Sequence, residues 1–293
     1  MKKTVIIVAG PTASGKTAVA IQLAKHFQTE IISADSRQCY KELNIGVARP
    51  SKEELQEVPH HFIASHSIQE EMTAAGFEQF ALQTTKELFT THDTIIMVGG
   101  TGLYIKAFCE GLDAIPAIEE KIRTRITSDY AKYGLEWLQQ QVQEKDPEFF
   151  TIGEIQNPQR LMRALEVVES TGRSILFFRK GNKAVRDFTI QKIGLDLPKE
   201  ELQQRIHQRV DKMMEQGLLN EVKQLEPYKH LNALQTVGYK ELFDYLDNKV
   251  SLDTAIESIK TNTRHYAKRQ LTWFRKDTAI KWMKPEKVLD FRF

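Results

Sequence analysis

The sequence has little cysteine, no long apolar run and almost no net charge. Its 293 residues include two cysteines, Cys39 and Cys109, which are far apart in the chain, so neither a disulfide framework nor a structural zinc site is expected. No stretch approaches the roughly 18 apolar residues that cross a membrane. The apolar run at 4–9, about six residues long, is too short for a signal peptide. We therefore expect a cytoplasmic protein with no membrane partner.

The composition is that of an ordinary globular protein. Lys and Arg number 41 and Asp and Glu 39, the formal net charge is +2, and 41% of the residues are hydrophobic. These values exclude disorder, collagen-like repeats and a coiled coil. A nucleic-acid partner stays possible, but it requires a basic surface that is local.

Short apolar runs alternate with helical patterns in the first third of the chain. This alternation predicts a parallel α/β sheet with helices on both faces, a three-layer α/β/α arrangement. The predicted strands lie at 4–9, 31–34 and 95–98, and the predicted helices at 16–27 and 73–89.

Beyond Gly111 the pattern changes to helices alone. Helical spacing runs from about 118 to 171, with Pro147 and Pro158 as breaks, and one β-like run returns at 188–195 before a helical stretch to about 276. A helical insertion in an α/β core explains this order. The predicted domains are the core, 1–113 and 185–293, and the insertion, 114–184.

The eight residues that directly follow the first strand match the P-loop template G-x-x-x-x-G-K-[ST] in full. The template context is also met, because the motif follows a strand and opens a helix. Backbone N–H groups and the helix dipole bind phosphate there, while the lysine adds a cation and the threonine hydroxyl can bind Mg²⁺. The residues are Gly10, Pro11, Thr12, Ala13, Ser14, Gly15, Lys16 and Thr17.

The P-loop does not identify the phosphate ester, but the residues around it disfavour an energy-coupling ATPase. An NTPase usually has an Asp that ends a later strand and helps to hold Mg²⁺, but the strand at 95–98 ends in Gly99-Gly100-Thr101. Asp35 is the acidic residue that ends a core strand, and it should lie at the carboxyl edge of the sheet beside the P-loop. It suits a Mg²⁺ ligand, a general base or a helix N-cap.

Polar and basic residues elsewhere suit an RNA partner. Arg37 and Gln38 can recognise a base edge or a phosphate, and Thr101 should face the same crevice as Asp35. Asn157 and Pro158 predict the start of a helix that places Arg160 and Arg163 on one face. Lys260, Arg264, Lys268 and Arg275 form a basic stripe on a later helix, beside aromatic residues that belong to the core.

Taken together, these motifs resemble those of a known family, the tRNA dimethylallyltransferases. The resemblance rests on the P-loop, Ser33 to Gln38, Gly99 to Tyr104, Asn157 to Glu166, Val237 to Glu241 and Lys268 to Arg275, in the family's order. Eukaryotic members add a C-terminal zinc finger after this point, so the bacterial type is expected.

The resemblance implies transfer of a dimethylallyl group from dimethylallyl diphosphate to the N6 amine of the adenosine 3′-adjacent to a tRNA anticodon (position 37). Asp35 would accept the amine proton and Thr101 would orient the adenine. Lys16 and Mg²⁺ would stabilise the departing diphosphate, and Arg123, in the insertion, would contact substrate near the diphosphate or the tRNA. The insertion would clamp the anticodon stem-loop, and the enzyme would be a monomer. The tRNA-binding residues implied are Asp35, Ser36, Arg37, Gln38, Thr101, Arg123, Gln159, Arg160, Leu161, Met162, Arg163, Gly238, Tyr239, Lys240, Lys268, Arg269, Gln270 and Arg275.

Two other functions use the same residues. In a P-loop small-molecule kinase, Asp35 would deprotonate a metabolite hydroxyl, but the arginine pair and the basic helix would have no role. A nucleotide-gated RNA-binding module without chemistry needs a γ-phosphate sensor, which the sequence does not offer.

Overall fold

The computed structural model describes residues 3–181 and 183–291, and these contain a six-stranded sheet whose neighbouring strands are all parallel. The strand order is β3-β2-β4-β1-β5-β6. The predicted parallel α/β sheet is therefore confirmed. The strands are β1 (Thr4–Ala9), β2 (Ile31–Ser33), β3 (His60–His61), β4 (Thr94–Gly99), β5 (Thr189–Leu195) and β6 (Ile280–Met283).

The central strands β1 and β4 read as apolar runs because both faces of the sheet are covered there. Val5 and Ile7 belong to a core cluster on one face, whereas Ile6 and Val8 belong to a second cluster on the other. Alternate residues of a strand point to opposite faces, so a sheet between two helical layers needs apolar residues at every position.

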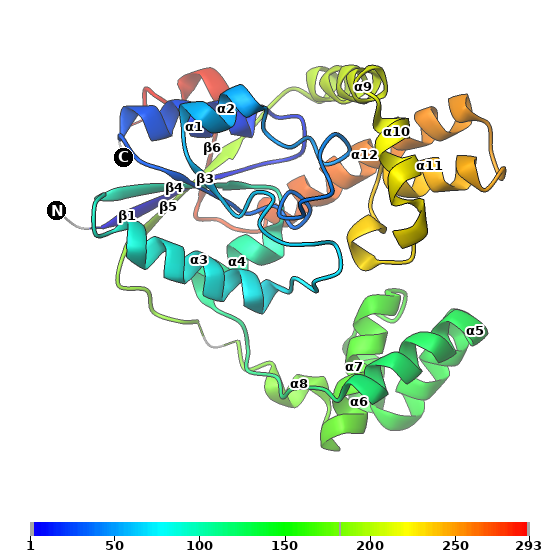
Figure 1. Cartoon of the computed structure of the whole chain (residues 1–293). Helices are drawn as coiled ribbons and strands as arrows, with labels where there is room; N and C mark the ends of the chain where they lie inside the picture. The colour runs from blue at the N-terminus through cyan, green and yellow to red at the C-terminus, as the bar shows by residue number, and fades with distance from the viewer. Residues whose placement is uncertain (1–2, 182, 292–293) are drawn as a thin grey trace. The chain divides into compact units, whose positions relative to one another are not determined.

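Helices form the two outer layers of the core unit (Figure 1). α1 supplies the second cluster on one face, and α3 and α4 supply the first cluster on the other. The helices of this unit are α1 (Lys16–His26), α2 (Lys52–Glu57), α3 (Ala74–Leu88), α4 (Gly102–Glu110), α9 (Lys199–Glu215), α10 (Leu218–Leu225), α11 (Tyr239–Leu246) and α12 (Leu252–Phe274), with 3₁₀ turns η1 (Glu226–Tyr228), η2 (Asn232–Leu234) and η3 (Pro285–Lys287).

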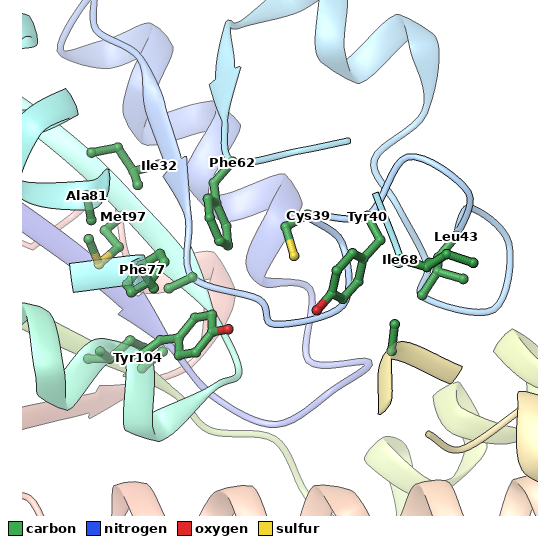
Figure 2. Close-up of a cluster of buried hydrophobic side chains, with 14 of the residues drawn as sticks. Ile32, Cys39, Tyr40, Leu43, Phe62, Ile68, Phe77, Ala81, Met97 and Tyr104 are labelled. Atoms are coloured by element: carbon green, nitrogen blue, oxygen red, sulfur yellow. The ribbon is translucent and has the colours of Figure 1, made fainter. Parts of the chain in front are cut away.

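Aromatic rings fill the first cluster (Figure 2). Phe77 of α3 stacks on Tyr104 of α4 with ring centroids 4.5 Å apart, and Phe62 lies 5.1 Å from Phe77. Cys39 is buried in this cluster, and burial raises the pKa of its thiol to about 12. It is therefore a core residue, with no disulfide.

The strand order decides which loops meet. β4 lies between β2 and β1, so the loops after these three strands leave the same edge of the sheet as neighbours. The loop after β1 is the P-loop, the loop after β2 begins at Asp35, and the turn after β4 contains Thr101. Ligands of open α/β sheets bind at such a carboxyl edge, where the strand order reverses.

The chain divides into two compact units, Met1–Cys109 with Val185–Phe293, and Glu110–Ala184. The second unit is helical and has its own core, which includes Leu138, Phe149 and Leu165. Asn157 caps a helix as predicted, because its side chain accepts the Arg160 N–H at 3.3 Å. The helices are α5 (Glu120–Lys145), α6 (Pro147–Ile152), α7 (Pro158–Thr171) and α8 (Ile175–Phe178).

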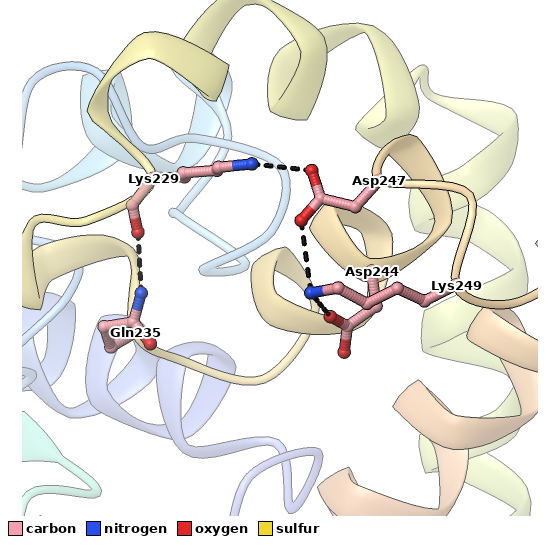
Figure 3. Close-up of polar contacts among 5 residues, drawn as sticks. All are labelled: Lys229, Gln235, Asp244, Asp247 and Lys249. Atoms are coloured by element: carbon pink, nitrogen blue, oxygen red, sulfur yellow. Dashed lines mark hydrogen bonds and ion pairs between the residues drawn. The ribbon is translucent and has the colours of Figure 1, made fainter. Parts of the chain in front are cut away.

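The segment between α10 and α11 is fixed by surface contacts (Figure 3). Lys229 Nζ donates to Asp247 Oδ1 at 2.6 Å, and Lys249 Nζ donates to Asp244 Oδ1 at 2.9 Å. Gln235 Nε2 donates to the Lys229 carbonyl at 2.6 Å. Exposed ion pairs add little stability, but these contacts tie the turn before α11 to the end of that helix.

The elements that the sequence did not predict include α2, α8, β3 and β6. β3 has two residues and β6 has four, which is too short for periodicity to identify them. Within the described residues, the helices include none that is both long and apolar enough to span a membrane.

Candidate active site

The P-loop connects β1 to α1 in a strained conformation and contains a buried hydroxyl that makes no hydrogen bond to the described residues. Ala13 adopts a positive φ of 64°, a strained state for a residue with a side chain and one that clusters at ligand sites. Ser14 is fully buried, and its hydroxyl has no hydrogen-bond partner among the described residues. A buried hydroxyl without a partner is costly, so this loop is shaped for a ligand.

Two cations lie at this loop. Lys16 Nζ donates to the Pro11 carbonyl at 2.6 Å, and Arg209 Nη1 donates to Thr12 Oγ1 at 3.3 Å. Burial, followed by the charge of Arg209, lowers the pKa of Lys16 to about 7, and Asp35 opposes this effect. Burial also lowers the pKa of Arg209. Desolvated cations side by side are unfavourable alone and favourable once a polyanion lies between them.

Arg209 was missed by the sequence analysis. It lies on α9 together with Arg205, whose Nη1 is 3.6 Å from the position that a Cβ of Gly15 would take. The two arginines are four residues apart and share a helix face. That spacing was the available signal, but no motif connects α9 with the P-loop, which is more than 180 positions earlier in the chain.

Asp35 follows β2 and organises its own loop. Its Oδ1 accepts the backbone N–H groups of Arg37 at 2.9 Å and Gln38 at 3.2 Å. Among the described residues its second oxygen accepts no hydrogen bond. These bonds close a turn, and no helix begins at Asp35, so the helix N-cap predicted for this residue is wrong.

Thr101 joins the loops after β2 and β4. Its Oγ1 accepts the Ser36 N–H at 3.0 Å and donates to Ser36 Oγ at 3.3 Å, and its own N–H donates to the Ala34 carbonyl at 3.2 Å. Asp35 lies between these two partners in sequence. The structure therefore brings Asp35 and Thr101 together, as expected from their positions at strand ends.

Gln38 and Arg37 have different surroundings. Gln38 Nε2 donates to the Val47 and Ala48 carbonyls at 3.1 and 2.9 Å, so it holds the next loop in place. Arg37 is partly buried, and its charge lowers the pKa of Tyr266, opposing burial and Asp35, which raise it. Of the two side chains, the Gln38 amide is therefore engaged within the protein, whereas the part of the chain that the structure describes gives the Arg37 guanidinium no hydrogen bond.

Gln270 requires a correction as a residue expected at the RNA surface. Its side chain is 6% exposed. Its Oε1 accepts the Thr12 N–H at 2.8 Å, and its Nε2 donates to the Gly100 carbonyl at 2.9 Å. The amide is consumed inside the protein, so contact between this side chain and RNA is the wrong prediction. Lys268, Arg269 and Arg275, from the same motif, are exposed.

The motif at 237–241 needs the same correction. Tyr239 is fully buried, and its hydroxyl donates to Glu221 Oε1 at 2.6 Å. Glu221 also accepts the N–H groups of Ile45 and Gly46. Gly238 is buried too, and Lys240 is exposed. Tyr239 therefore holds the loop after β2 and cannot reach RNA with its side chain.

The helical unit carries a basic cluster. Arg163 Nη1 lies 3.1 Å from Glu166 Oε2, and Arg123 Nε lies 3.8 Å from Glu166 Oε1. Burial, then the charge of Arg160, lowers the pKa of Arg179, which places a further arginine in the cluster. Arg160 Nη1 also lies 2.5 Å from Glu154 Oε2, so three of these four arginines have a carboxylate partner among the described residues. A cluster of arginines suits a phosphate backbone.

The other predicted positions of α7 divide between surface and core. Gln159 and Arg160 are exposed and Met162 is partly buried, but Leu161 is fully buried in the core of the helical unit. Leu161 is therefore a packing residue, and its predicted contact with tRNA is wrong for the side chain. Helix geometry explains this, because residues one apart point in different directions.

Comparison with known proteins decides the family. A family model described as IPP transferase matches residues 38–277. The tRNA dimethylallyltransferase of Christiangramia forsetii is 49% identical over 282 residues, which cover 96% of this chain and 93% of that protein. This chain belongs to the tRNA dimethylallyltransferase family.

Other dimethylallyltransferases agree with this assignment. The Cytophaga hutchinsonii protein is 45% identical over 99% of this chain and 95% of its own length. The full-length tRNA isopentenylpyrophosphate transferase of Bacillus halodurans has a TM-score of 0.71 at 35% identity, with 99% of this chain and 94% of that chain covered. A eukaryotic dimethylallyltransferase acting on tRNA has a TM-score of 0.79 at 29% identity, with 97% and 74% covered. Membership of this transferase family favours prenyl transfer over a kinase and over an RNA-binding module without chemistry.

Proposed function

We propose that this chain transfers a dimethylallyl group from dimethylallyl diphosphate to the N6 amine of the adenosine 3′-adjacent to the anticodon, at position 37 of tRNA, and releases diphosphate. The observation that carries the proposal is the convergence of Lys16, Arg209 and Asp35 at one edge of the sheet. Two cations suit a leaving diphosphate, and a carboxylate suits the acceptor amine.

The P-loop residues Gly10 to Thr17 would hold the diphosphate. An allylic carbon can carry positive charge as its bond to oxygen breaks, so stabilising the departing diphosphate lowers the barrier. Lys16 and Arg209 provide that stabilisation from two elements, α1 and α9. The unpartnered Ser14 hydroxyl adds a donor inside the loop.

Mg²⁺ is proposed as the cofactor, with Thr17 as its protein ligand. Thr17 is the second residue of α1 and is partly buried. Mg²⁺ keeps several waters and binds few protein oxygens beside phosphate, so one hydroxyl fits this donor set. When bound, the ion neutralises charge on the diphosphate.

Asp35 is proposed as the proton acceptor. An aromatic exocyclic amine is a poor base and nucleophile, and its proton becomes acidic as the C–N bond forms. The oxygen of Asp35 that is not used in its own turn can take that proton. Thr101 would orient the adenine from the neighbouring strand end.

The tRNA contacts are proposed on both units. On the helical unit they are Arg123, Gln159, Arg160, Met162 and Arg163, and on the core unit Ser36, Arg37, Lys240, Lys268, Arg269 and Arg275. These side chains are exposed or partly buried. The flipped adenine would come from a loop, where unstacking costs less than in a duplex. We propose a monomer that acts in the cytoplasm.

A direct assay tests the proposal. The protein is incubated with Mg²⁺, labelled dimethylallyl diphosphate and bulk tRNA, and label in tRNA is measured together with released diphosphate. Transfer of label with stoichiometric diphosphate release is expected. Formation of ADP from ATP with a small-molecule acceptor, and no label in tRNA, would replace the proposal with the kinase.

A further inference from the structure

We propose that Gln270 is a positioning residue for the transfer reaction, which fixes the separation between the phosphate loop and the acceptor loops. This inference rests on the proposed function, because it assumes that the diphosphate occupies the P-loop and that the adenine lies near Thr101 and Asp35. Gln270 itself touches neither substrate.

One buried amide joins the two loops. The Oε1 atom of Gln270 accepts the Thr12 N–H of the P-loop at 2.8 Å, and the Nε2 atom donates to the Gly100 carbonyl at 2.9 Å. The side chain is 6% exposed, so water does not compete effectively for these bonds. The same side chain therefore hydrogen-bonds both the P-loop, on the side of the prenyl donor, and the turn before Thr101, on the side of the acceptor adenine.

Two glycines, which have no side chain, leave room for α12 to pack against the turn after β4. A Cβ at Gly100 would lie 2.2 Å from Gln270 Nε2, and a Cβ at Gly102 would lie 2.1 Å from Trp273 Nε1. Gln270 and Trp273 are three residues apart on α12 and share a face. The helix therefore docks on the turn after β4 through contacts that only glycine permits.

The connection continues to the proposed proton acceptor. Gly100 is followed by Thr101, whose Oγ1 accepts the Ser36 N–H at 3.0 Å, and Ser36 follows Asp35. A path of short contacts thus runs from the P-loop through Gln270 and Thr101 to the Asp35 loop. Reacting atoms tolerate little displacement, and about 1 Å of misplacement can cost on the order of 100-fold in rate.

The chemistry of the amide suits this position. A glutamine offers one acceptor and two donors, whereas an ionised glutamate only accepts. Gln270→Glu keeps a partner for the Thr12 N–H but places a negative charge against the Gly100 carbonyl and near the diphosphate. Gln270→Met keeps the length and removes both hydrogen bonds.

Steady-state kinetics of both variants test the inference. For Gln270→Met we expect kcat to fall about 10- to 100-fold, with KM for each substrate within about threefold, because geometry is lost and substrate contacts are not. For Gln270→Glu we expect a similar fall in kcat and, in addition, a rise in KM for the prenyl diphosphate. Values of kcat within twofold of wild type in both variants would overturn the inference.

A control and a second variant separate positioning from stability. Asn262→Leu also removes a side-chain amide of α12, one that donates to Glu241 Oε1 at 2.7 Å, and it should lower Tm without changing kcat. Gly100→Ala should displace the Gln270 amide and reproduce the loss of kcat. The double variant Gly100→Ala with Gln270→Met should then be no slower than the slower single variant, and full additivity would contradict the bridge.

The experiments distinguish failure of the proposed function from failure of the positioning role. A wild-type protein that transfers no prenyl label to tRNA refutes the reaction itself. An active wild type with unaffected Gln270 variants refutes only the positioning role. If Gln270→Met does not fold, Gln270→Glu and Gly100→Ala decide the question.

Discussion

Lys16 and Arg209 meet at the phosphate loop, where burial and then the charge of Arg209 lower the pKa of Lys16 to about 7. Arg209 reaches the loop from α9 and donates to Thr12 Oγ1. The ligand-free protein thus holds two cations at a cost in free energy, which a bound diphosphate would remove. The affinity for diphosphate and the protonation of Lys16 are therefore expected to be coupled.

Diphosphate affinity should depend on pH through Lys16. Below pH 7 the lysine is protonated before and after binding, so affinity is constant in this respect. Above pH 7 binding must take up a proton, because an adjacent diphosphate raises the pKa of the lysine, and affinity should fall by up to about tenfold per pH unit. Calorimetric titration with pyrophosphate measures this, and Lys16→Met corrects for titration of the ligand. Parallel pH profiles in the two proteins would refute the coupling.

Lys16→Met should stabilise the ligand-free protein while it weakens diphosphate binding, which Arg209 and the loop N–H groups still support. The folded pKa of about 7 lies below the model value of 10.5, so the lysine destabilises the fold fully below pH 7 and progressively less up to pH 10.5. We expect a Tm gain of a few °C, about 2–4 °C per kcal/mol, at pH 6. The gain should shrink by pH 10. Equal Tm values at pH 6 would show that the lysine carries no such penalty.

Asp35→Asn should separate the two roles of this residue. Asparagine can still accept the Arg37 and Gln38 N–H groups, so the loop is kept and tRNA affinity stays within about twofold. Loss of the proton acceptor should lower kcat by about 10²- to 10⁴-fold. Asp35→Ala removes the turn as well and should also lower Tm. Rapid-quench measurement of prenyl transfer at saturating substrates checks this, and unchanged turnover in Asp35→Asn would remove Asp35 from the chemistry.

Arg160→Ala and Arg163→Ala should weaken tRNA binding uniformly and flatten its salt dependence. Each lost phosphate contact reduces the slope of log K against log salt by about one. Arg125→Ala is the matched control on α5, because that arginine is paired with carboxylates as Arg160 and Arg163 are but lies outside the proposed tRNA contacts. Its slope should equal that of wild type. Filter binding from low to high salt measures the slopes. Equal slopes in all proteins would assign both arginines to intramolecular ion pairs.

Tyr239→Phe should act on stability and leave RNA affinity intact. The lost hydroxyl deprives Glu221 of a 2.6 Å hydrogen bond inside the core, which should cost about 1–3 kcal/mol of unfolding free energy. Thermal or urea denaturation measures the loss. A weakened tRNA complex with unchanged stability would restore the original expectation of an RNA contact.

Local sequence accounts for the first half of the site. The strand at 4–9, the loop Gly10 to Thr17 and the helix that opens at Lys16 are consecutive, so spacing and turn chemistry identify them without long-range information. Asp35 and Thr101 were placed correctly at strand ends for the same reason, since parallel strands deliver their loops to one edge. The N-cap at Asn157 is also a local signal.

The roles of Arg209, Gln270, Tyr239 and Leu161 depended on tertiary structure. Each residue type is ambiguous alone: an arginine on an amphipathic helix, an amide or a tyrosine in a polar motif, and a leucine between basic residues. The roles of Arg209 and Gln270 follow from Thr12, which is 197 and 258 positions away. The role of Tyr239 follows from Glu221 on another helix, and that of Leu161 from the side of its helix that faces a core. The sequence by itself determined the strand, the glycine-rich loop and the helix that together predict a phosphate site. Packing of α9 and α12 against that loop decided which side chains surround it, because contacts between distant segments exist only once both have folded onto the sheet.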